Sequence, residues 1–463
     1  MTRTAVLNVV GLTRGLIGEH TPRLRAFLQA HRHAVIDPAL PAVTCTAQSD
    51  YLTGQRPEAH GVVANGWLNR ELSEVHFWKQ SNHVVTAPKL WDELRANDPS
   101  FTCAKLFWWF NMYSGADWSV TPRPMYPADG RKFFDIYSWP ADLRPALKAD
   151  LGDFPFATFW GPAAGVKSPQ GEPDAATRWI ANSAKWVEEK HRPTLNLVYL
   201  PHLDYNLQRL GPKRPAVVDD LRRIDTIVGD LLDFFGARGV QVLVLSEYGI
   251  TPVDTPVHLN REFRKRGWIT IREELGLELL DTGNSKAFAV ADHQLAHIYV
   301  NDRTILGEVQ ALLESTPGVA EVWDFADQVE HGLAHPRTGN LVAVAQENAW
   351  FTYYYWLDDA KAPDFARCVD IHRKPGYDPV ELFLDPAIPV VKLKIAWRLL
   401  QKKLGFRMLM DVIPLDASLV KGSHGCRPTS REDWPLVIAP GALPGDELTS
   451  TQIYGVMRDA VLG

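Results

Sequence analysis

Residues 194–249 read TLNLVYLPHLDYNLQRLGPKRPAVVDDLRRIDTIVGDLLDFFGARGVQVLVLSEYG, and this stretch decides the fold. It opens with Thr194–Leu200, an apolar run that is typical of a buried parallel strand. Apolar residues then recur at helical spacing over residues 218–235, Gly239 ends that helix, and Val240–Leu245 forms a second strand. A strand, a helix and a strand in this order predict a right-handed parallel crossover.

The beginning of the chain repeats this alternation. Ala5–Val10 is another short apolar run, which ends at Gly11 and is typical of a buried strand. Thr21 and Pro22 then open a second helical pattern. Residues 296–323 read as a small strand–helix–strand unit. The sequence therefore predicts a mixed α/β fold with a central, mostly parallel sheet flanked by helices.

The length and composition fit one large domain with insertions. The chain has 463 residues, of which 46% are hydrophobic and 22% are charged, as is usual for a globular enzyme. We expect a single α/β domain over residues 1–463. Residues from about 101 to 190 are rich in Trp and Pro and indicate an irregular insertion over the sheet. Residues from about 255 to 380 are expected to form a cap or a further insertion.

Charge and cysteine content exclude several classes of protein. The net charge is −6, which does not favour a general nucleic-acid partner. The four cysteines are scattered without metal-site spacing, and the N-terminus has no signal-peptide pattern. Because no apolar run is long enough to span a bilayer, we expect a cytoplasmic protein without a transmembrane segment. Residues 392–407 are basic and amphipathic, which suits either an anionic surface or, more commonly, a solvated helix face.

Polar side chains follow the predicted strands at the sheet edge where ligands bind in open α/β folds. His202, Asp204 and Gln208 follow one strand, and Glu247 and Tyr248 follow the next. Carboxylates and imidazoles collected at one edge are typical of a metal site. The alternative is that these residues cap loops and pair with arginines.

Four motifs in order carry a family resemblance. They are LPAVTCTAQ at 40–48 with LTG at 52–54 and PEAHG at 57–61, YLPHLD at 199–204, SEYG at 246–249, and GSHG at 422–425. In order and spacing they resemble the alkaline phosphatase superfamily, specifically its nucleotide pyrophosphatase/phosphodiesterase branch. The resemblance implies an alkaline phosphatase-like sandwich in which insertions form a cap over the sheet.

The resemblance also implies roles for single residues. Thr44 falls on the nucleophile of the family, and Asn65 falls on the asparagine that binds a phosphoryl oxygen. Asp204 and His424 fall on metal ligands. The family holds two divalent ions, usually zinc, which activate the threonine and stabilise the charge on the phosphoryl oxygens. The cofactor expected from the resemblance is therefore a divalent metal, most naturally zinc.

The sequence departs from the family at four positions. Val10 replaces the first metal-binding Asp, Gln208 replaces a His, and Glu247-Tyr248 replaces Asp-His. Other residues are candidates for rebuilding the site. The further metal candidates are Glu247, His202, Asp292 and His293, and the substrate-binding candidates are Gln208, Tyr248, His372, Arg373 and Lys374.

The first expectation for function is a hydrolase that cleaves a phosphodiester, pyrophosphate or phosphonate bond through Thr44 at a remodelled metal site. Its partner would be a small molecule that contains phosphate or phosphonate. One alternative is a metal-free relative that binds a ligand without turnover. Another is acid–base or transfer chemistry on a metabolite, carried by Glu247, His293 and His372.

Overall fold

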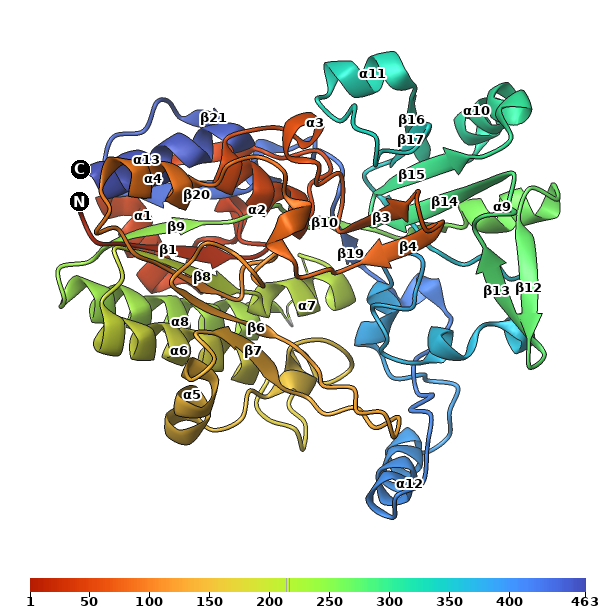
Figure 1. Ribbon diagram of the computed structural model, residues 1–463, viewed down its shortest axis with the longest axis horizontal. Helices are drawn as coiled ribbons and strands as arrows, with labels where there is room; N and C mark the ends of the chain where they lie inside the picture. The colour runs from red at the N-terminus through yellow and green to blue at the C-terminus, as the bar shows by residue number, and fades with distance from the viewer. Residues whose placement is uncertain (214, 216) are drawn as a thin grey trace.

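The computed structural model describes residues 1–213, 215 and 217–463, which fold into two lobes (Figure 1). The first lobe is built on a nine-stranded sheet with β1 at its centre. The strand order is β21 (Glu447–Thr449), β2 (Arg32–Asp37), β20 (Leu436–Ala439), β9 (Gln241–Leu245), β1 (Thr4–Val9), β8 (Leu195–Leu200), β5 (Cys103–Leu106), β6 (Trp118–Pro122) and β7 (Ile136–Trp139). The strands β9, β1, β8, β5 and β6 run parallel, so the predicted mostly parallel α/β sheet is confirmed.

Helices cover both faces of this sheet (Figure 1). On one face lie α1 (Pro22–Ala30), α6 (Ala175–His191) and α8 (Val217–Gly236), and on the other lie α2 (Thr44–Thr53), α4 (Leu90–Asn97) and α13 (Ile453–Leu462). The helix α8 turns a stripe of apolar residues toward the sheet, including the fully buried Ile224, Val228 and Leu231. It follows α7 (His202–Leu210) and leads into β9, which is the crossover that the sequence predicts.

The second lobe has its own hydrophobic core. A four-stranded antiparallel sheet in the order β14 (Ala287–Asp292), β15 (Leu295–Val300), β17 (Leu341–Ala345) and β16 (Val319–Trp323) forms its centre. Paired strands surround it: β3 (Gly66–Asn69) with β4 (Glu74–Phe77), β12 (Thr270–Glu274) with β13 (Leu277–Asp281), and β11 (Thr255–Val257) with β18 (Ala349–Phe351). Its helices are α9 (Leu259–Lys265), α10 (Leu306–Ser315), α11 (Phe325–Glu330) and α12 (Val391–Lys403). The unit expected at 296–323 is β15–α10–β16, with β17 lying between the two strands.

The prediction of an irregular insertion at 101–190 is wrong for most of that range. Strands β5, β6 and β7 belong to the central sheet, and α5 (Leu143–Leu151) and α6 are regular helices. These strands have four or five residues each, which is too short for a period of two to stand out among the aromatic residues. Within the described residues, no helix combines the length and the apolarity that crossing a bilayer requires.

Candidate functional site

The candidate site lies at the carboxyl ends of β1, β8 and β9, where the two lobes meet. The central strands are in register, because Asn8 of β1 pairs with Tyr199 of β8 and with Leu245 of β9. Glu247 therefore follows close beyond the end of β9, and Asp204 lies in the first turn of α7, which follows β8. Ligand sites in parallel sheets form at this edge.

Thr44 is the first residue of α2, and only 3% of its surface is exposed. Its hydroxyl lies 3.3 Å from the Tyr248 hydroxyl, which donates to Asp204 Oδ1 at 3.1 Å. Since tyrosine has one hydroxyl proton, Thr44 is the donor in the first of these bonds. The three side chains form a chain along which a proton can pass from Thr44 toward Asp204.

Two further side chains extend this chain. Gln208 donates through Nε2 to Asp204 Oδ2 at 2.9 Å, and its Oε1 accepts the Tyr377 hydroxyl at 2.7 Å. Burial raises the pKa of Asp204 to about 7, although the hydrogen bonds from Gln208 and Tyr248 lower it. Asp204 is therefore able to accept a proton near neutral pH.

Glu247 is a buried carboxyl group beside Thr44. Its Oε1 accepts hydrogen bonds from the amides of Asn8 and Gln48, and Gln48 is itself fixed by the backbone N–H of Trp109 at 2.7 Å. Burial raises the pKa of Glu247 to about 8, although the hydrogen bonds from Gln48 and Asn8 lower it. At neutral pH Glu247 is consequently mostly protonated.

Asn65 and Asp292 join the second lobe to the start of α2. Asn65 accepts the backbone N–H of Cys45 through Oδ1 at 3.0 Å. It donates to Asp292 twice, from its backbone N–H at 2.7 Å and from Nδ2 at 3.1 Å. His293 Nδ1 also lies 2.7 Å from Asp292 Oδ1. Burial raises the pKa of Asp292 to about 6, although its bonds to Asn65 lower it.

Four rings stack at the lobe junction. Tyr248 lies on His424 with 3.5 Å between ring centroids, His424 lies 3.8 Å from His293, and His293 lies 3.5 Å from Tyr377. His424 Nδ1 donates to the carbonyl of Ala42 at 2.7 Å, which leaves Nε2 as an acceptor. Burial holds the pKa of both imidazoles well below its usual value, so the two rings are neutral.

Tryptophans line the outer side of this stack. Trp78 and Trp160 lie 6.1 and 5.8 Å from Tyr377 between ring centroids, and Trp109 lies 5.1 Å from Trp78. Trp78 and Trp160 also pack against the core of the second lobe, and Trp109 is buried, so these rings hold Tyr377 in place by packing.

Four of the sequence-predicted residues have their contacts outside the hydrogen-bonded chain of Thr44, Tyr248 and Asp204. His372 is held at 3.3 Å from the carbonyl of Phe77. Arg373 is about half exposed and pairs with Asp364 at 3.1 Å. Lys374 is buried in ion pairs with two carboxylates, Asp378 at 2.8 Å and Glu381 at 2.7 Å. These contacts give each of the three side chains a partner, and their expected part in substrate binding stays a prediction.

His202 is the fourth residue placed elsewhere. In an extended segment, His202 and Asp204 would point to the same side. The segment is instead the first turn of α7, and residues two apart on a helix point in different directions. His202 Nε2 lies 3.0 Å from Asp220 Oδ1 of α8, so it faces the helix layer.

The residues at the family's ligand positions do not fit two zinc ions. Val10 offers only a hydrocarbon side chain, Gln208 an amide and Tyr248 a phenol that stays protonated, because burial raises its pKa well above the usual value. The carboxylates Asp204 and Asp292 already accept hydrogen bonds from neutral donors. In the part of the chain that the structure describes, no three His, Cys, Asp or Glu side chains converge as a metal site would require.

Sequence reasoning missed Asn8, Gln48 and Tyr377 as members of the site. Asn8 could have been found from the sequence, because it is a polar residue inside the apolar run of a buried strand. A fully buried polar side chain needs a hydrogen-bond partner. Tyr377 reaches the site from the second lobe, 169 residues beyond its hydrogen-bond partner Gln208. No local pattern encodes such a contact.

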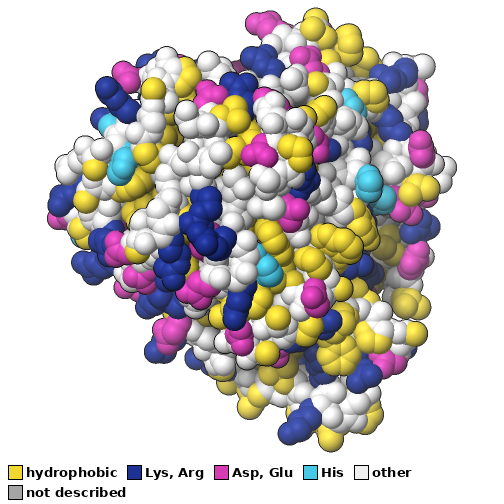
Figure 2. All heavy atoms as spheres, turned by 60° about the vertical axis from the view of Figure 1, so that its left-hand side comes forward, with side chains coloured by type: hydrophobic (Ala, Val, Ile, Leu, Met, Phe, Trp, Pro, Cys, Tyr) yellow, Lys and Arg dark blue, Asp and Glu magenta, His cyan; other side chains and the backbone are white. Residues whose placement is uncertain are grey.

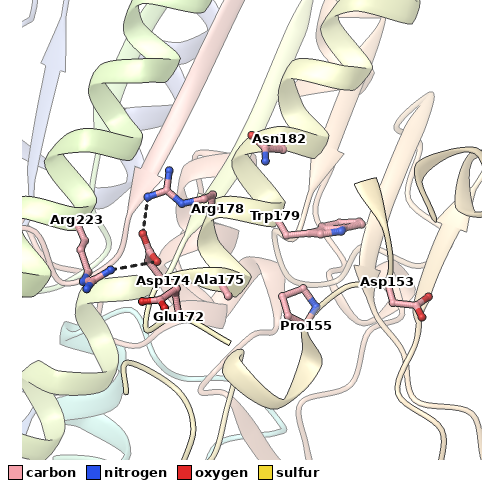
Figure 3. Close-up of a pocket in the computed structure, with 9 residues that line it drawn as sticks. All are labelled: Asp153, Pro155, Glu172, Asp174, Ala175, Arg178, Trp179, Asn182 and Arg223. Atoms are coloured by element: carbon pink, nitrogen blue, oxygen red, sulfur yellow. Dashed lines mark hydrogen bonds and ion pairs between the residues drawn. The ribbon is translucent and has the colours of Figure 1, made fainter. Parts of the chain in front are cut away.

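A surface hollow of about 400 Å³ lies apart from these residues, at the N-terminal end of α6 (Figure 3). Arg178 and Arg223 line it, and each is paired with Asp174, at 2.6 and 3.5 Å. Arg223 is also paired with Asp219 at 3.0 Å. Neither arginine of this described lining is therefore left without a carboxylate partner for a phosphate to meet.

The parallel sheet, the buried threonine at a helix start and the acids beyond the strand ends agree with the alkaline phosphatase-like fold that the four motifs predict. A sequence profile of the family described as type I phosphodiesterase / nucleotide pyrophosphatase matches residues 4–378. The chain therefore belongs to that family.

Individual relatives are distant. An uncharacterized pyrophosphatase/phosphodiesterase of Schizosaccharomyces pombe is 22% identical over 242 residues, which are 50% of this chain and 41% of that protein. A structure of murine ectonucleotide pyrophosphatase / phosphodiesterase 5, an inactive variant in complex with AMP, matches with a TM-score of 0.58 and 13% identity, covering 100% of this chain and 95% of the other. Phosphonoacetate hydrolase from Sinorhizobium meliloti with phosphonoformate matches with a TM-score of 0.62 and 13% identity, covering 99% and 96%. These two structures share the fold.

Proposed function

We propose that the chain is a hydrolase of small phosphorylated or phosphonate compounds, and that Thr44 is its nucleophile. The observation that carries the proposal is the hydrogen-bonded chain from Thr44 through Tyr248 to Asp204. A threonine hydroxyl is a weak nucleophile unless a metal or a base removes its proton. Asp204, with a pKa of about 7, is the base within reach of this chain.

The chemical step follows from these contacts. Asp204 takes the Tyr248 proton, Tyr248 takes the Thr44 proton, the bond from Thr44 Oγ1 to phosphorus forms, and the bond to the leaving group breaks. The leaving group takes its proton from solvent water, and Glu247, protonated at neutral pH, places no negative charge beside Thr44. Water then attacks the phosphothreonine and leaves its proton on the phosphate product. The bond from phosphorus to Thr44 Oγ1 breaks, and the proton held by Asp204 returns through Tyr248 to Thr44. The N-terminal end of α2 favours the negative charge that builds on the phosphoryl oxygens.

The proposed mechanism uses no bound metal ion, because Gln208 and Tyr248 carry an amide and a phenol at positions where the family has metal ligands. The sequence-based expectation of a remodelled site with zinc remains the rival form of the same hydrolase, with Asp204, Glu247 and His424 as ligands. The metal-free binder is the second rival, since a stacked and hydrogen-bonded site also suits a ligand that is held without turnover.

One experiment separates these forms. Wild type, Thr44→Ala and Thr44→Ser are assayed on an aryl phosphodiester, a dinucleotide pyrophosphate and phosphonoacetate, each with chelator and with added zinc. We expect turnover that resists the chelator, falls by about 10³-fold or more in Thr44→Ala, and survives in part in Thr44→Ser. Circular dichroism melts check that each variant is folded.

Three results decide against the proposal. Full activity in Thr44→Ala removes Thr44 as the nucleophile. Turnover that requires zinc and disappears together with bound metal in His424→Ala establishes the metal-dependent form instead. If calorimetry shows tight binding of phosphonoacetate and no condition gives turnover, the result supports a protein that binds its ligand without catalysis.

The cytoplasmic location stays a prediction. The four cysteines are buried thiols, as expected for a reducing compartment.

A further inference from the structure

Helix α12 projects from the second lobe, and every one of its residues is at least partly exposed (Figure 1). Leu393, Trp397, Leu400 and Leu404 follow one another at intervals of four, three and four residues, so they lie on one face. Their exposed fractions are 68%, 57%, 45% and 64%. These four residues are called the apolar stripe. A row of large apolar side chains on a helix normally faces a core, and this one faces outward.

The orientation of α12 is fixed from its other side. Val391 and Ile395 pack against the core of the second lobe. Asp411 binds Lys394 at 2.8 Å and Arg398 at 2.9 Å. The apolar stripe therefore cannot reach that core by rotation of the helix without losing both ion pairs and this packing.

A neighbouring loop, residues 123–134 between β6 and β7, continues the exposed apolar surface. Lys402 Nζ donates to the carbonyl of Lys132 at 3.4 Å, and Arg407 donates to that of Asp129 at 3.4 Å, so the loop lies against the end of α12. The further exposed apolar side chains on this surface are Met125, Tyr126, Phe133, Phe134, Phe406 and Leu409. Figure 2 shows hydrophobic and basic side chains together on the lowest part of the molecule, where α12 lies.

The charge of this surface opposes that of the rest of the chain. Residues 388–409 contain six Lys and Arg and no Asp or Glu, whereas the whole chain has a net charge of −6. Lys392 and Lys403 flank the apolar stripe, and neither forms an ion pair with any carboxylate of the described residues. A basic rim around Leu, Trp and Phe is the composition of helices that lie in the membrane interface.

We propose that α12 and the loop 123–134 form a peripheral membrane-binding surface that docks on bilayers containing anionic lipids. The 13 residues of α12 extend about 20 Å, so the helix lies in the plane of the interface rather than across it. The apolar stripe enters the boundary between headgroups and acyl chains. The lysines beside it extend their ammonium groups to the lipid phosphates. This inference does not depend on the chemistry of Thr44.

A second copy of the chain is the other occupant to consider, and charge disfavours it. In a two-fold dimer the same patch meets itself, so two strongly basic surfaces would face each other. An anionic bilayer instead supplies the complementary charge and an apolar interior together.

Vesicle sedimentation tests the proposal on the full chain. Wild type is mixed with vesicles of phosphatidylcholine alone and with vesicles that also contain phosphatidylglycerol. We expect binding to the second kind only, weakened by salt, and reduced by about tenfold or more in the double variant Trp397→Ser/Leu400→Ser. The double variant Lys392→Gln/Lys403→Gln is expected to lose the preference for anionic lipid. Brominated lipids should quench a component of tryptophan fluorescence that Trp397→Phe removes.

A matched control comes from the same lobe. Phe325 of α11 is 70% exposed and lies outside the proposed surface, so Phe325→Ser should bind vesicles as wild type does. Equal sedimentation of wild type and both double variants, or no sedimentation of wild type, overturns the proposal. A dimer in analytical ultracentrifugation that Trp397→Ser/Leu400→Ser dissociates, without vesicle binding by wild type, assigns the surface to a second copy instead.

Discussion

Tyr248 is the residue on which the proposed proton path depends, because among the described residues only its hydroxyl links Thr44 to Asp204. Tyr248→Phe keeps the ring that stacks on His424 and removes only this link. We expect kcat/KM to fall by about 10²- to 10⁴-fold. The wild-type rate should rise with pH through about 7, where Asp204 loses its proton, and this rise should be absent in the variant. Stopped assays across a pH series measure both effects.

Tyr353→Phe is the matched control for this prediction. Tyr353 is also fully buried, and its hydroxyl has no hydrogen-bond partner among the described residues. Losing that hydroxyl should leave the activity and its pH profile unchanged. An unaltered profile in Tyr248→Phe would show that Thr44 is activated by another route.

At the scale of elements, the contact between α7 and β19 (Gly422–Ser423) positions His424. A Cβ on Gly422 would lie 2.1 Å from the carbonyl oxygen of Leu207 and 2.7 Å from Ile250 Cγ2, so only glycine allows this approach. We expect Gly422→Ala to lower the free energy of unfolding by about 1–3 kcal/mol and to reduce activity by displacing His424. Urea unfolding measures the first effect.

Gly441 provides the comparison for this substitution. A Cβ there meets no atom within 4 Å, and the residue does not adopt a positive φ. Gly441→Ala should therefore leave stability unchanged or raise it slightly, since it restricts the unfolded chain. If the two alanine substitutions changed the free energy of unfolding equally, the α7–β19 contact would be able to rearrange at little cost.

The whole molecule carries three buried carboxyl groups at one site, with pKa values raised mainly by burial to about 7 for Asp204, about 8 for Glu247 and about 6 for Asp292. Unfolded carboxyl groups titrate near ~4, so between pH ~4 and the folded pKa the native state holds more protons. The free energy of unfolding therefore falls as pH rises through this window, by up to ~1.4 kcal/mol per pH unit for each group.

Glu247→Gln tests this dependence, because it replaces one of the three titrating groups by a neutral one of similar shape. We expect the decline in unfolding free energy toward pH ~8 to become less steep in the variant. Urea titrations over a pH series provide the slopes. Glu330→Gln, at an exposed position of α11, should keep the wild-type slope. Parallel slopes for wild type and Glu247→Gln would show that Glu247 is ionised throughout.

The sequence by itself determined the parallel sheet, because short apolar runs at β1, β8 and β9 and a 3.6-residue periodicity at α8 indicate burial directly. It also placed Asp204, Glu247 and Tyr248 together, since residues beyond parallel strands share one edge. Thr44, Asn65 and His424 were added by the family resemblance of their motifs. Only the tertiary structure decided that α7 turns His202 away, that Tyr377 reaches Gln208 from the second lobe, and that Lys374 is held in buried ion pairs. These are contacts between segments far apart in the chain, and local pattern does not encode the direction in which a side chain finally points.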